Sequence, residues 1–319
     1  MIRDQIFIPI TFDLPFVVGN MNIYLFPGEP LTLLDTGPKT EPARHAIEKT
    51  FEEHGLRIEQ IKRIVISHGH VDHFGLAREL AEKSGAEIFI HPCDAPKVQR
   101  GYHFYGELSP FLREAGVPEE HLGELEGWCT FADSIKEPLE NVQLLEDEAA
   151  IPFETFSLRV IHCPGHAQGH IALYHEASGD LFGGDHILRN ITPNPAMERS
   201  CKEPEKRNQA LVQYLASVKK IEQLHVKRIL GAHGPAVENP QERIEQIYRH
   251  HLRRKEKLLG LLNGKGATAY ELGKKLFGTA KEADIFLTVS EVFAHLDLLL
   301  EENRARAEKN NGVFRYFAA

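Results

Sequence analysis

The run Ser67-His68-Gly69-His70-Val71-Asp72-His73 carries four side chains of metal-binding type within six residues. It follows directly on Arg63 to Ile66, a short apolar segment that predicts a buried strand. Imidazole nitrogens and a carboxylate are ligands that suit zinc and similar divalent ions. Buried His and Asp side chains are costly without partners, so four of them together are wasteful as structure alone. The run therefore predicts a metal site at the end of a strand.

Three more segments place a ligand-type residue beside glycine at the end of a predicted strand. They are Cys163-Pro164-Gly165-His166, Phe182-Gly183-Gly184-Asp185-His186 and Gly231-Ala232-His233-Gly234-Pro235. Glycine lets the backbone approach a crowded centre closely. An isolated Pro-Gly-His is more often a turn than a ligand, so each segment alone is a weak signal. Their order along the chain, at successive strand ends, favours one shared metal centre.

The first 238 residues alternate short β-like segments with amphipathic helices. Strands are expected at residues 6–10, 22–26, 31–34, 63–66, 87–90, 158–162, 170–174, 180–182 and 228–230, and helices at 40–53, 76–83 and about 204–223. Pro27-Gly28-Glu29 predicts a hairpin turn. At residues 98–138, aromatic residues stand among Gly, Pro and Glu, which predicts a helical insertion. The insertion either covers the site or packs as an excursion with a small core of its own.

The chain changes character after about residue 238. Helices are expected at residues 241–262, 268–277 and 285–302, and Asn310-Asn311-Gly312 can turn a final hairpin between residues 304 and 317. Three helices followed by a hairpin is the order of a winged helix. We therefore expect a catalytic domain at residues 1–238, with its insertion at about 98–138, and a winged-helix-like domain at residues 239–319.

The motifs resemble those of the metallo-β-lactamase superfamily, in the branch that includes glyoxalase II-like hydrolases. Asp35, the cluster from His68 to His73, His166, Asp185 and His233 follow in the order typical of that family. The resemblance covers about residues 5–238. It implies an α+β fold, a four-layer αββα sandwich with the metal centre at one edge. The tail, through the run from Tyr248 to Glu256, resembles the β-lactamase-like protein 2 group, which includes an RNA-cutting member and polyketide thioesterases.

The resemblance also implies two divalent metal ions and assigns their ligands. His68, His70 and His166 would hold the first metal, Asp72, His73 and His233 the second, and Asp185 would bridge both. Zinc is the expected metal, and manganese and iron suit the same ligands. Asp35 would support the ligand loop. Cys163 stands where the family more often has Thr and is expected to be a small buried side chain.

The resemblance implies a hydrolase in which a metal-bridging hydroxide attacks a small ester, thioester or lactone. His70 favours this reading, because the oxygen-reducing di-iron branch usually carries Glu there. Asp72, His170 and His186 are the candidate catalytic residues, the two histidines being equally acceptable as structural residues. Candidate substrate contacts are Tyr102, His103, Tyr105, Arg189 and Asn194.

Two other functions stay open: a metal-dependent nuclease that cuts single-stranded RNA or DNA, and a binding module with a vestigial metal site. The residues before 240 carry 35 acidic and 23 basic side chains, a balance of −12 that disfavours a long polyanion. The expected recognition helix at 285–302 carries acidic residues and no Lys or Arg. We therefore expect a small acyl substrate, with the tail packed on the catalytic domain or on a second copy in a homodimer.

The four cysteines, Cys93, Cys129, Cys163 and Cys201, form no CxxC pair. We expect reduced thiols in a cytoplasmic protein. The N-terminus shows no signal-peptide pattern, and no apolar stretch approaches the length of a membrane span.

Overall fold

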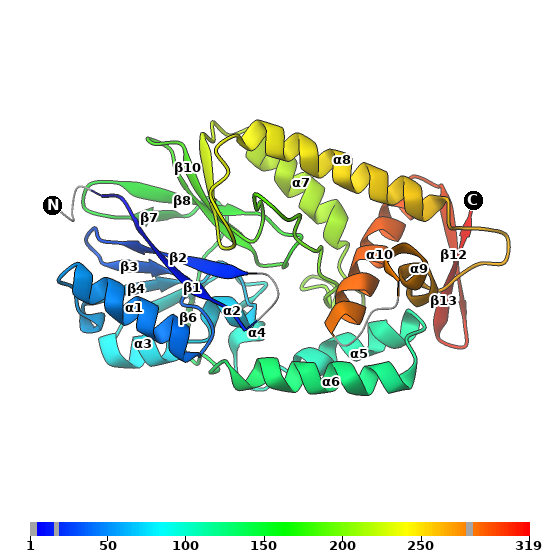
Figure 1. Ribbon diagram of the computed structural model, residues 1–319, viewed down its shortest axis with the longest axis horizontal. Helices are drawn as coiled ribbons and strands as arrows, with labels where there is room; N and C mark the ends of the chain where they lie inside the picture. The colour runs from blue at the N-terminus through cyan, green and yellow to red at the C-terminus, as the bar shows by residue number, and fades with distance from the viewer. Residues whose placement is uncertain (1–4, 16–18, 279–282) are drawn as a thin grey trace.

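Two β-sheets lie face to face in the computed structural model, which describes residues 5–15, 19–278 and 283–319 (Figure 1). The first sheet has the order β1(Ile8–Asp13), β2(Asn20–Phe26), β3(Thr32–Leu34), β4(Arg63–Val65), β5(Glu87–Ile90), β6(Val142–Leu144). The second has the order β11(Arg228–Gly231), β10(Asp180–Gly184), β9(Ile171–His175), β8(Ser157–His162), β7(Ala150–Pro152). Strands β3 to β6 run parallel, and so do β10 and β11.

Helices cover the outer face of each sheet. On the first sheet, α1(Glu41–Glu53) and α3(Ala77–Ser84) share an apolar core with the strands. On the second sheet, α7(Ala210–Glu222) and α8(Pro240–Leu259) do the same. A third core lies between the sheets, where Phe182 packs edge-on against Phe26 with ring centroids 4.8 Å apart. Each fully buried aromatic side chain of this kind stabilises the fold by roughly 1.5–3 kcal/mol. The predicted α+β, four-layer αββα sandwich is confirmed.

Most predicted strands and helices are present with ends shifted by one or two residues. Two strands were not predicted, β6 and β7, because each has three residues and at most one buried side chain. Short helices at α2(Val71–Phe74), α4(Ala95–Val98) and η2(Ile58–Gln60) were also not predicted. The helix expected from residue 204 begins only at Ala210. The side chain of Asn208 holds the preceding segment as a loop, accepting from Glu198 N and donating to Ala196 O.

The insertion and the tail share one apolar core. The insertion forms α5(Phe104–Glu114) and α6(Glu119–Ser134), and the tail forms α9(Ala269–Phe277), α10(Ala283–Glu301), β12(Ala305–Asn310) and β13(Val313–Ala318). Leu112 and Leu125 of the insertion lie in the same buried cluster as Leu272, Val292 and Leu296 of the tail. The insertion therefore has no separate core, and α5 and α6 lie beside α10 and the hairpin (Figure 1).

The helix order and the final hairpin of the tail agree with the sequence, and the hairpin pairs from Ala305–Ala318 to Asn310–Val313. The division of the chain at residue 238 and the winged-helix assignment stay predictions. Asn239 accepts a hydrogen bond from Glu242 N and Pro240 occupies the first turn, so α8 begins at that point. Among the described residues, no helix has the length and apolar character that crossing a membrane requires.

Candidate metal centre

The loop after β4 is held in place by Asp35. This residue follows β3 and adopts a positive φ of 60°. Its carboxylate accepts hydrogen bonds from Ser67 N at 2.7 Å, from Ser67 Oγ at 2.8 Å and from His73 Nδ1 at 2.8 Å. A short helix, α2, then turns Asp72 and His73 back toward the strand ends. Asp35 thus has the supporting position that the sequence predicted.

The three histidines predicted for the first metal converge. His70 Nδ1 lies 2.9 Å from His68 Nε2 and 3.1 Å from His166 Nε2. The three residues come from two loops, one after β4 and one after β8. Gly165 makes this approach possible, because its φ is 144° and a Cβ there would lie 2.4 Å from the Tyr214 Cβ.

The residues predicted for the second metal, Asp72, His73 and His233, form another such group. His233 Nε2 lies 3.7 Å from Asp72 Oδ2, and His73 Nε2 lies 3.9 Å from the same oxygen. Asp185 stands between the two groups. Its Oδ2 lies 3.4 Å from His166 Nε2 and 3.7 Å from His73 Nε2, while its Oδ1 lies 3.3 Å from His233 Nε2. One carboxylate thus faces both groups.

Four of the five histidines in the two groups have a hydrogen-bond acceptor at Nδ1, the nitrogen that faces away from the cluster. The pairs are His68 with Ser67 Oγ at 3.1 Å, His73 with Asp35 at 2.8 Å, His166 with Asn194 O at 3.0 Å and His233 with Asn20 O at 3.2 Å. A proton fixed at Nδ1 leaves the Nε2 lone pair free for a metal. His70 has the reverse orientation, with Nδ1 toward the cluster.

The residues fit divalent cations. His73 Nε2 and Asp185 Oδ1 are buried and have no hydrogen-bond partner among the residues that the structure describes, and such atoms cost roughly 1–3 kcal/mol each. Burial opposes protonation of His73, yet the carboxylates of Asp35, Asp72 and Asp185 raise its pKa well above the ordinary value. Burial likewise opposes protonation of His233, and Asp185 and Asp72 raise its pKa to about 9. The site therefore has excess negative charge that bound cations would neutralise.

His170 and His186, the other candidate catalytic residues, lie behind the ligand residues. His170 is fully buried, accepts from Asp185 N at 3.0 Å through Nε2, and has Cys163 Sγ 3.2 Å from Nδ1. Gly184 has a φ of 49°, and a Cβ there would lie 2.7 Å from His170 Nε2. His186 is fully buried with its ring centroid 4.8 Å from that of Tyr214, and neither of its nitrogens has a hydrogen-bond partner in the described part of the chain. His170 therefore supports the backbone of Asp185, His186 packs against Tyr214, and a catalytic role for either residue stays a prediction.

The predicted substrate contacts are scattered. Tyr102 lies close to the Lys97 and Glu198 charges, which shift its pKa in opposite directions while burial raises it. His103 is exposed at the start of α5, and Tyr105 packs against the tail core. Arg189 is exposed and donates to Ala236 O. The Asn194 side chain donates to Leu287 O on α10, while the backbone carbonyl of Asn194 faces His166 Nδ1.

Sequence reasoning missed a buried charge network beside the first group of histidines. Lys97 Nζ lies 2.6 Å from Glu198 Oε1 and 2.7 Å from Asp94 Oδ1. All three side chains are at most 7% exposed. Asp94 and Lys97 lie at the start of α4 and on it, after β5, and Glu198 lies in the loop after β10. The three residues form no sequence motif, so the sequence showed only charged residues between apolar segments.

The expectation of four reduced cysteines is wrong for one pair. Cys93 and Cys201 form a disulfide with their Cα atoms 5.5 Å apart, while Cys129 and Cys163 are free and buried. The sequence did not indicate this pair, because the two cysteines are 108 residues apart and have no CxxC spacing. Cys163 is completely buried, as expected.

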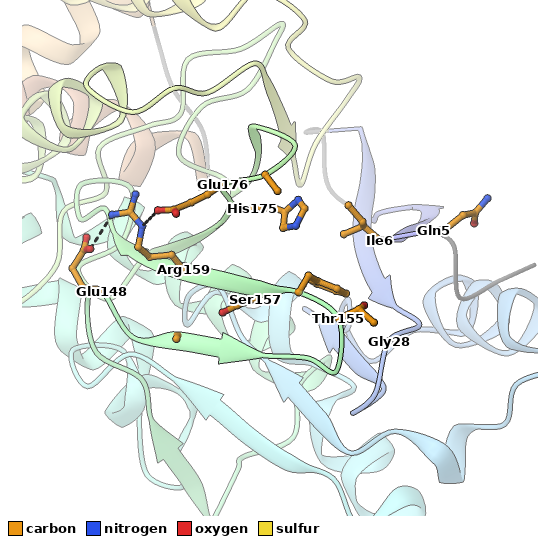
Figure 2. A pocket seen from close by; sticks show the side chains of 12 residues that line it. Gln5, Ile6, Gly28, Glu148, Thr155, Ser157, Arg159, His175 and Glu176 are labelled. Atoms are coloured by element: carbon orange, nitrogen blue, oxygen red, sulfur yellow. Dashed lines mark hydrogen bonds and ion pairs between the residues drawn. The ribbon is translucent and has the colours of Figure 1, made fainter.

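Two other features lie away from the centre. His250, His251 and Glu291 gather between α8 and α10, with Arg254 Nη1 3.9 Å from Glu291 Oε1. A cavity of about 640 Å³ lies at the ends of β8 and β9 remote from His166, and Figure 2 shows Arg159 in it, paired with Glu148 and Glu176. This cavity contains none of the predicted ligands.

The αββα sandwich and the His and Asp groups at the strand ends define a class of metal-dependent hydrolases. The chain belongs to the metallo-beta-lactamase superfamily, whose model matches residues 17–233. It is 31% identical to the probable metallo-hydrolase YqjP of Bacillus subtilis over 92% of each chain. A Thermus thermophilus structure, the metallo-beta-lactamase family protein TTHA1429, superimposes with a TM-score of 0.82 at 28% identity, covering 98% of this chain and 99% of its own.

Two further relatives are similar to this chain over most of its length. A Caenorhabditis elegans protein named beta-lactamase-like protein 2 homolog is 24% identical over 78% of this chain and 67% of its own length. A Pseudocercospora fijiensis protein named atrochrysone carboxyl ACP thioesterase is 21% identical over 95% of this chain and 74% of its own length. The predicted resemblance to the β-lactamase-like protein 2 group is therefore supported along most of the chain.

Proposed function

We propose that this chain is a dinuclear metal-dependent hydrolase that cleaves a small ester, thioester or lactone. The position of Asp185 carries the proposal, because its two oxygens face His166 and His73 on one side and His233 on the other. A carboxylate placed in this way suits a bridge between two cations. Zinc is the metal we propose, since the ligands are five imidazoles and two carboxylates.

Two divalent metals held here would supply an acidified water as nucleophile and a Lewis acid for the carbonyl oxygen of the substrate. The chain's own residues orient these groups. Asp35 fixes the His73 ring and the start of the loop through three hydrogen bonds. Asp72 is partly exposed within the cluster, so its carboxylate can accept a proton from the attacking water. His170 holds the backbone of Asp185.

An acyl substrate is favoured over a nucleic acid for three reasons. A relative is named as a thioesterase, and the part of the chain before residue 240 has an acidic balance. Helix α10, the expected nucleic-acid recognition helix, instead buries most of its side chains, with Val289, Val292 and Leu296 in the tail core. Its Asp297 pairs with Arg207 at 2.6 Å. These observations support a small-molecule partner; a homodimer and a cytoplasmic location stay predictions.

The deciding experiment combines metal analysis with a substrate panel. Protein reconstituted with zinc should contain close to two ions per chain and should hydrolyse a thioester, ester or lactone faster than any phosphodiester or RNA. Asp185→Ala should lose metal and activity together. Asp147→Ala, which removes an exposed carboxylate paired with Lys220, should change neither. Full activity in metal-free protein would refute the proposal, and a preference for RNA would favour the nuclease.

A further inference from the structure

We propose that Glu198 is a positioning residue for the first metal site: with Lys97 and Asp94 it holds His70 in the tautomer that presents Nδ1 to the metal. The inference rests on the proposed metal centre and extends it to a part of the chain outside the family motifs. Glu198 would set the orientation and the basicity of His70 and would not contact the substrate.

The orientation of His70 sets it apart from the other four histidines. They have a hydrogen-bond acceptor at Nδ1, whereas the Nδ1 of His70 points to His68 and His166. The nitrogen left over is Nε2, and it lies 3.8 Å from Glu198 Oε1. A carboxylate facing the remote nitrogen favours a proton there and leaves the other nitrogen's lone pair free. Glu198 thus faces the remote nitrogen of His70 at 3.8 Å, on the side that corresponds to Asp35, which hydrogen-bonds the remote nitrogen of His73 at 2.8 Å.

The buried charges do not balance without a positive partner. Glu198 is 4% exposed, Asp94 is completely buried, and Lys97 is 7% exposed. The two carboxylates and the one ammonium together leave a net charge of −1. Glu198 Oε1 is the carboxylate oxygen of this network that faces His70. The Lys97 ammonium, 2.6 Å from Glu198 Oε1, stabilises the ionised form of this buried carboxylate. An imidazole bound to a cation is the partner that this charge suits.

The same network fixes the backbone on both sides of the first ligand group. Asp94 Oδ2 accepts from Gly69 N at 2.7 Å, and Asp94 Oδ1 accepts from Gly169 N at 2.8 Å. Glu198 Oε2 accepts from Gln168 N at 3.2 Å. Gly69 lies between His68 and His70, and residues 168 and 169 follow closely on His166. The three side chains therefore tie together the two loops that supply the first metal's ligands.

Glu198 has its carboxylate fixed before any ligand binds. Lys97 Nζ lies 2.6 Å from Oε1, and the Gln168 backbone and side chain reach Oε2. The neighbouring disulfide, from Cys93 to Cys201, joins the two segments that carry Asp94 and Glu198. A carboxylate restrained in this way can orient an imidazole without losing side-chain entropy when the metal binds.

The test measures the two stepwise zinc dissociation constants by competition with a chromophoric chelator, in the wild type and in Glu198→Gln. We expect one constant to rise about 10- to 100-fold and the other to stay unchanged. The cobalt(II) absorption spectrum should change for the weakened site alone. Glu203→Gln is the matched control, since it removes a carboxylate that is exposed and paired with Lys206 in the same segment; its constants should equal those of the wild type.

If Glu198→Gln does not fold, the two zinc dissociation constants are measured in the double variant Lys97→Met/Glu198→Gln, and the same change in one constant is expected. It keeps the net charge of the buried network while removing the carboxylate that faces His70. Wild-type constants in a folded variant, with two ions bound and acyl hydrolysis intact in the wild type, would overturn this inference alone. A wild type that binds no metal would overturn both the inference and the proposed function.

Discussion

Asp35 shows how one side chain can organise a metal site without binding the metal. Its backbone adopts φ 60°, a left-handed conformation in which Asn is tolerated and Ala is strained. Asp35→Asn should therefore keep the backbone but lose one carboxylate oxygen and the charge beside His73. We expect zinc affinity to fall about 10- to 100-fold. Chelator competition measures this, and unchanged affinity would show that the Asp35–His73 contact is structural only.

Glu291 is the residue whose ionisation should make stability depend on pH. It is buried between α8 and α10, and burial raises its pKa to about 7 although Arg254 lies near and opposes the rise. The folded state thus holds a proton that the unfolded chain releases near pH 4.5. Between these two pKa values the folded state binds more protons, so stability should fall as pH rises.

Glu291→Gln should remove this loss. Above pH 7 the variant should be more stable than the wild type by about 3 kcal/mol, and the difference should shrink toward zero at pH 4. Burial lowers the pKa of the facing side chains His250 and His295, but they are present in both proteins, so the comparison subtracts them. Urea unfolding at several pH values measures the difference; a constant difference would place the Glu291 pKa near its ordinary value.

The sequence predicted individual metal ligands where they lie together in one short run or beside glycine. The seven predicted ligand residues come together because strands β4, β8, β10 and β11 end at the same edge of the sandwich. Glu198 and Lys97 could not be found in this way. They are 101 residues apart, and a buried ion pair leaves no periodicity or spacing in the sequence.

Among the elements, the insertion is the one whose role the sequence left open. Its helices α5 and α6 have no core of their own and complete that of the tail. Aromatic residues among Gly and Glu predicted helices, but the partner lies more than 100 residues away, and only the folded chain reveals it. Strands β6 and β7 were missed for a local reason, since three-residue strands give no alternating pattern.

The shared core predicts that the insertion and the tail unfold together. Leu112 on α5 is completely buried in the cluster that contains Leu272 and Val292 of the tail. Leu112→Ala should destabilise the protein by about 2–5 kcal/mol. Limited proteolysis should then cut the α5–α6 region and the tail at the same rate. Leu252→Ala, at a leucine that is 54% exposed on α8, is the control and should change neither stability nor proteolysis. Faster cleavage of the insertion alone would show that it folds separately.

The molecule as a whole is held by contacts between segments far apart in sequence. Arg207 pairs with Asp297 through two hydrogen bonds of 2.7 and 2.6 Å, joining the sandwich to α10. Lys97 and Glu198 join the segment after β5 to the segment after β10. Hydrophobic periodicity predicted most of the individual strands and helices, because burial on one face of an element repeats locally, whereas the two-sheet arrangement was implied by the family resemblance. It could not predict these long-range pairs, since each depends on the complete fold.

The disulfide is the long-range contact most open to a direct test. It closes a loop of 108 residues between Cys93 and Cys201, and a disulfide of this kind stabilises a fold by roughly 2–4 kcal/mol. The double variant Cys93→Ser/Cys201→Ser should lose stability by about that amount in urea unfolding. Alkylation of the unreduced, denatured protein should modify only Cys129 and Cys163, and reduction should expose all four thiols. Modification of all four thiols without reduction would instead show that the disulfide is absent, as the sequence predicted. Because reducing compartments keep such pairs open, the same count made on protein taken directly from cells also tests the predicted cytoplasmic location.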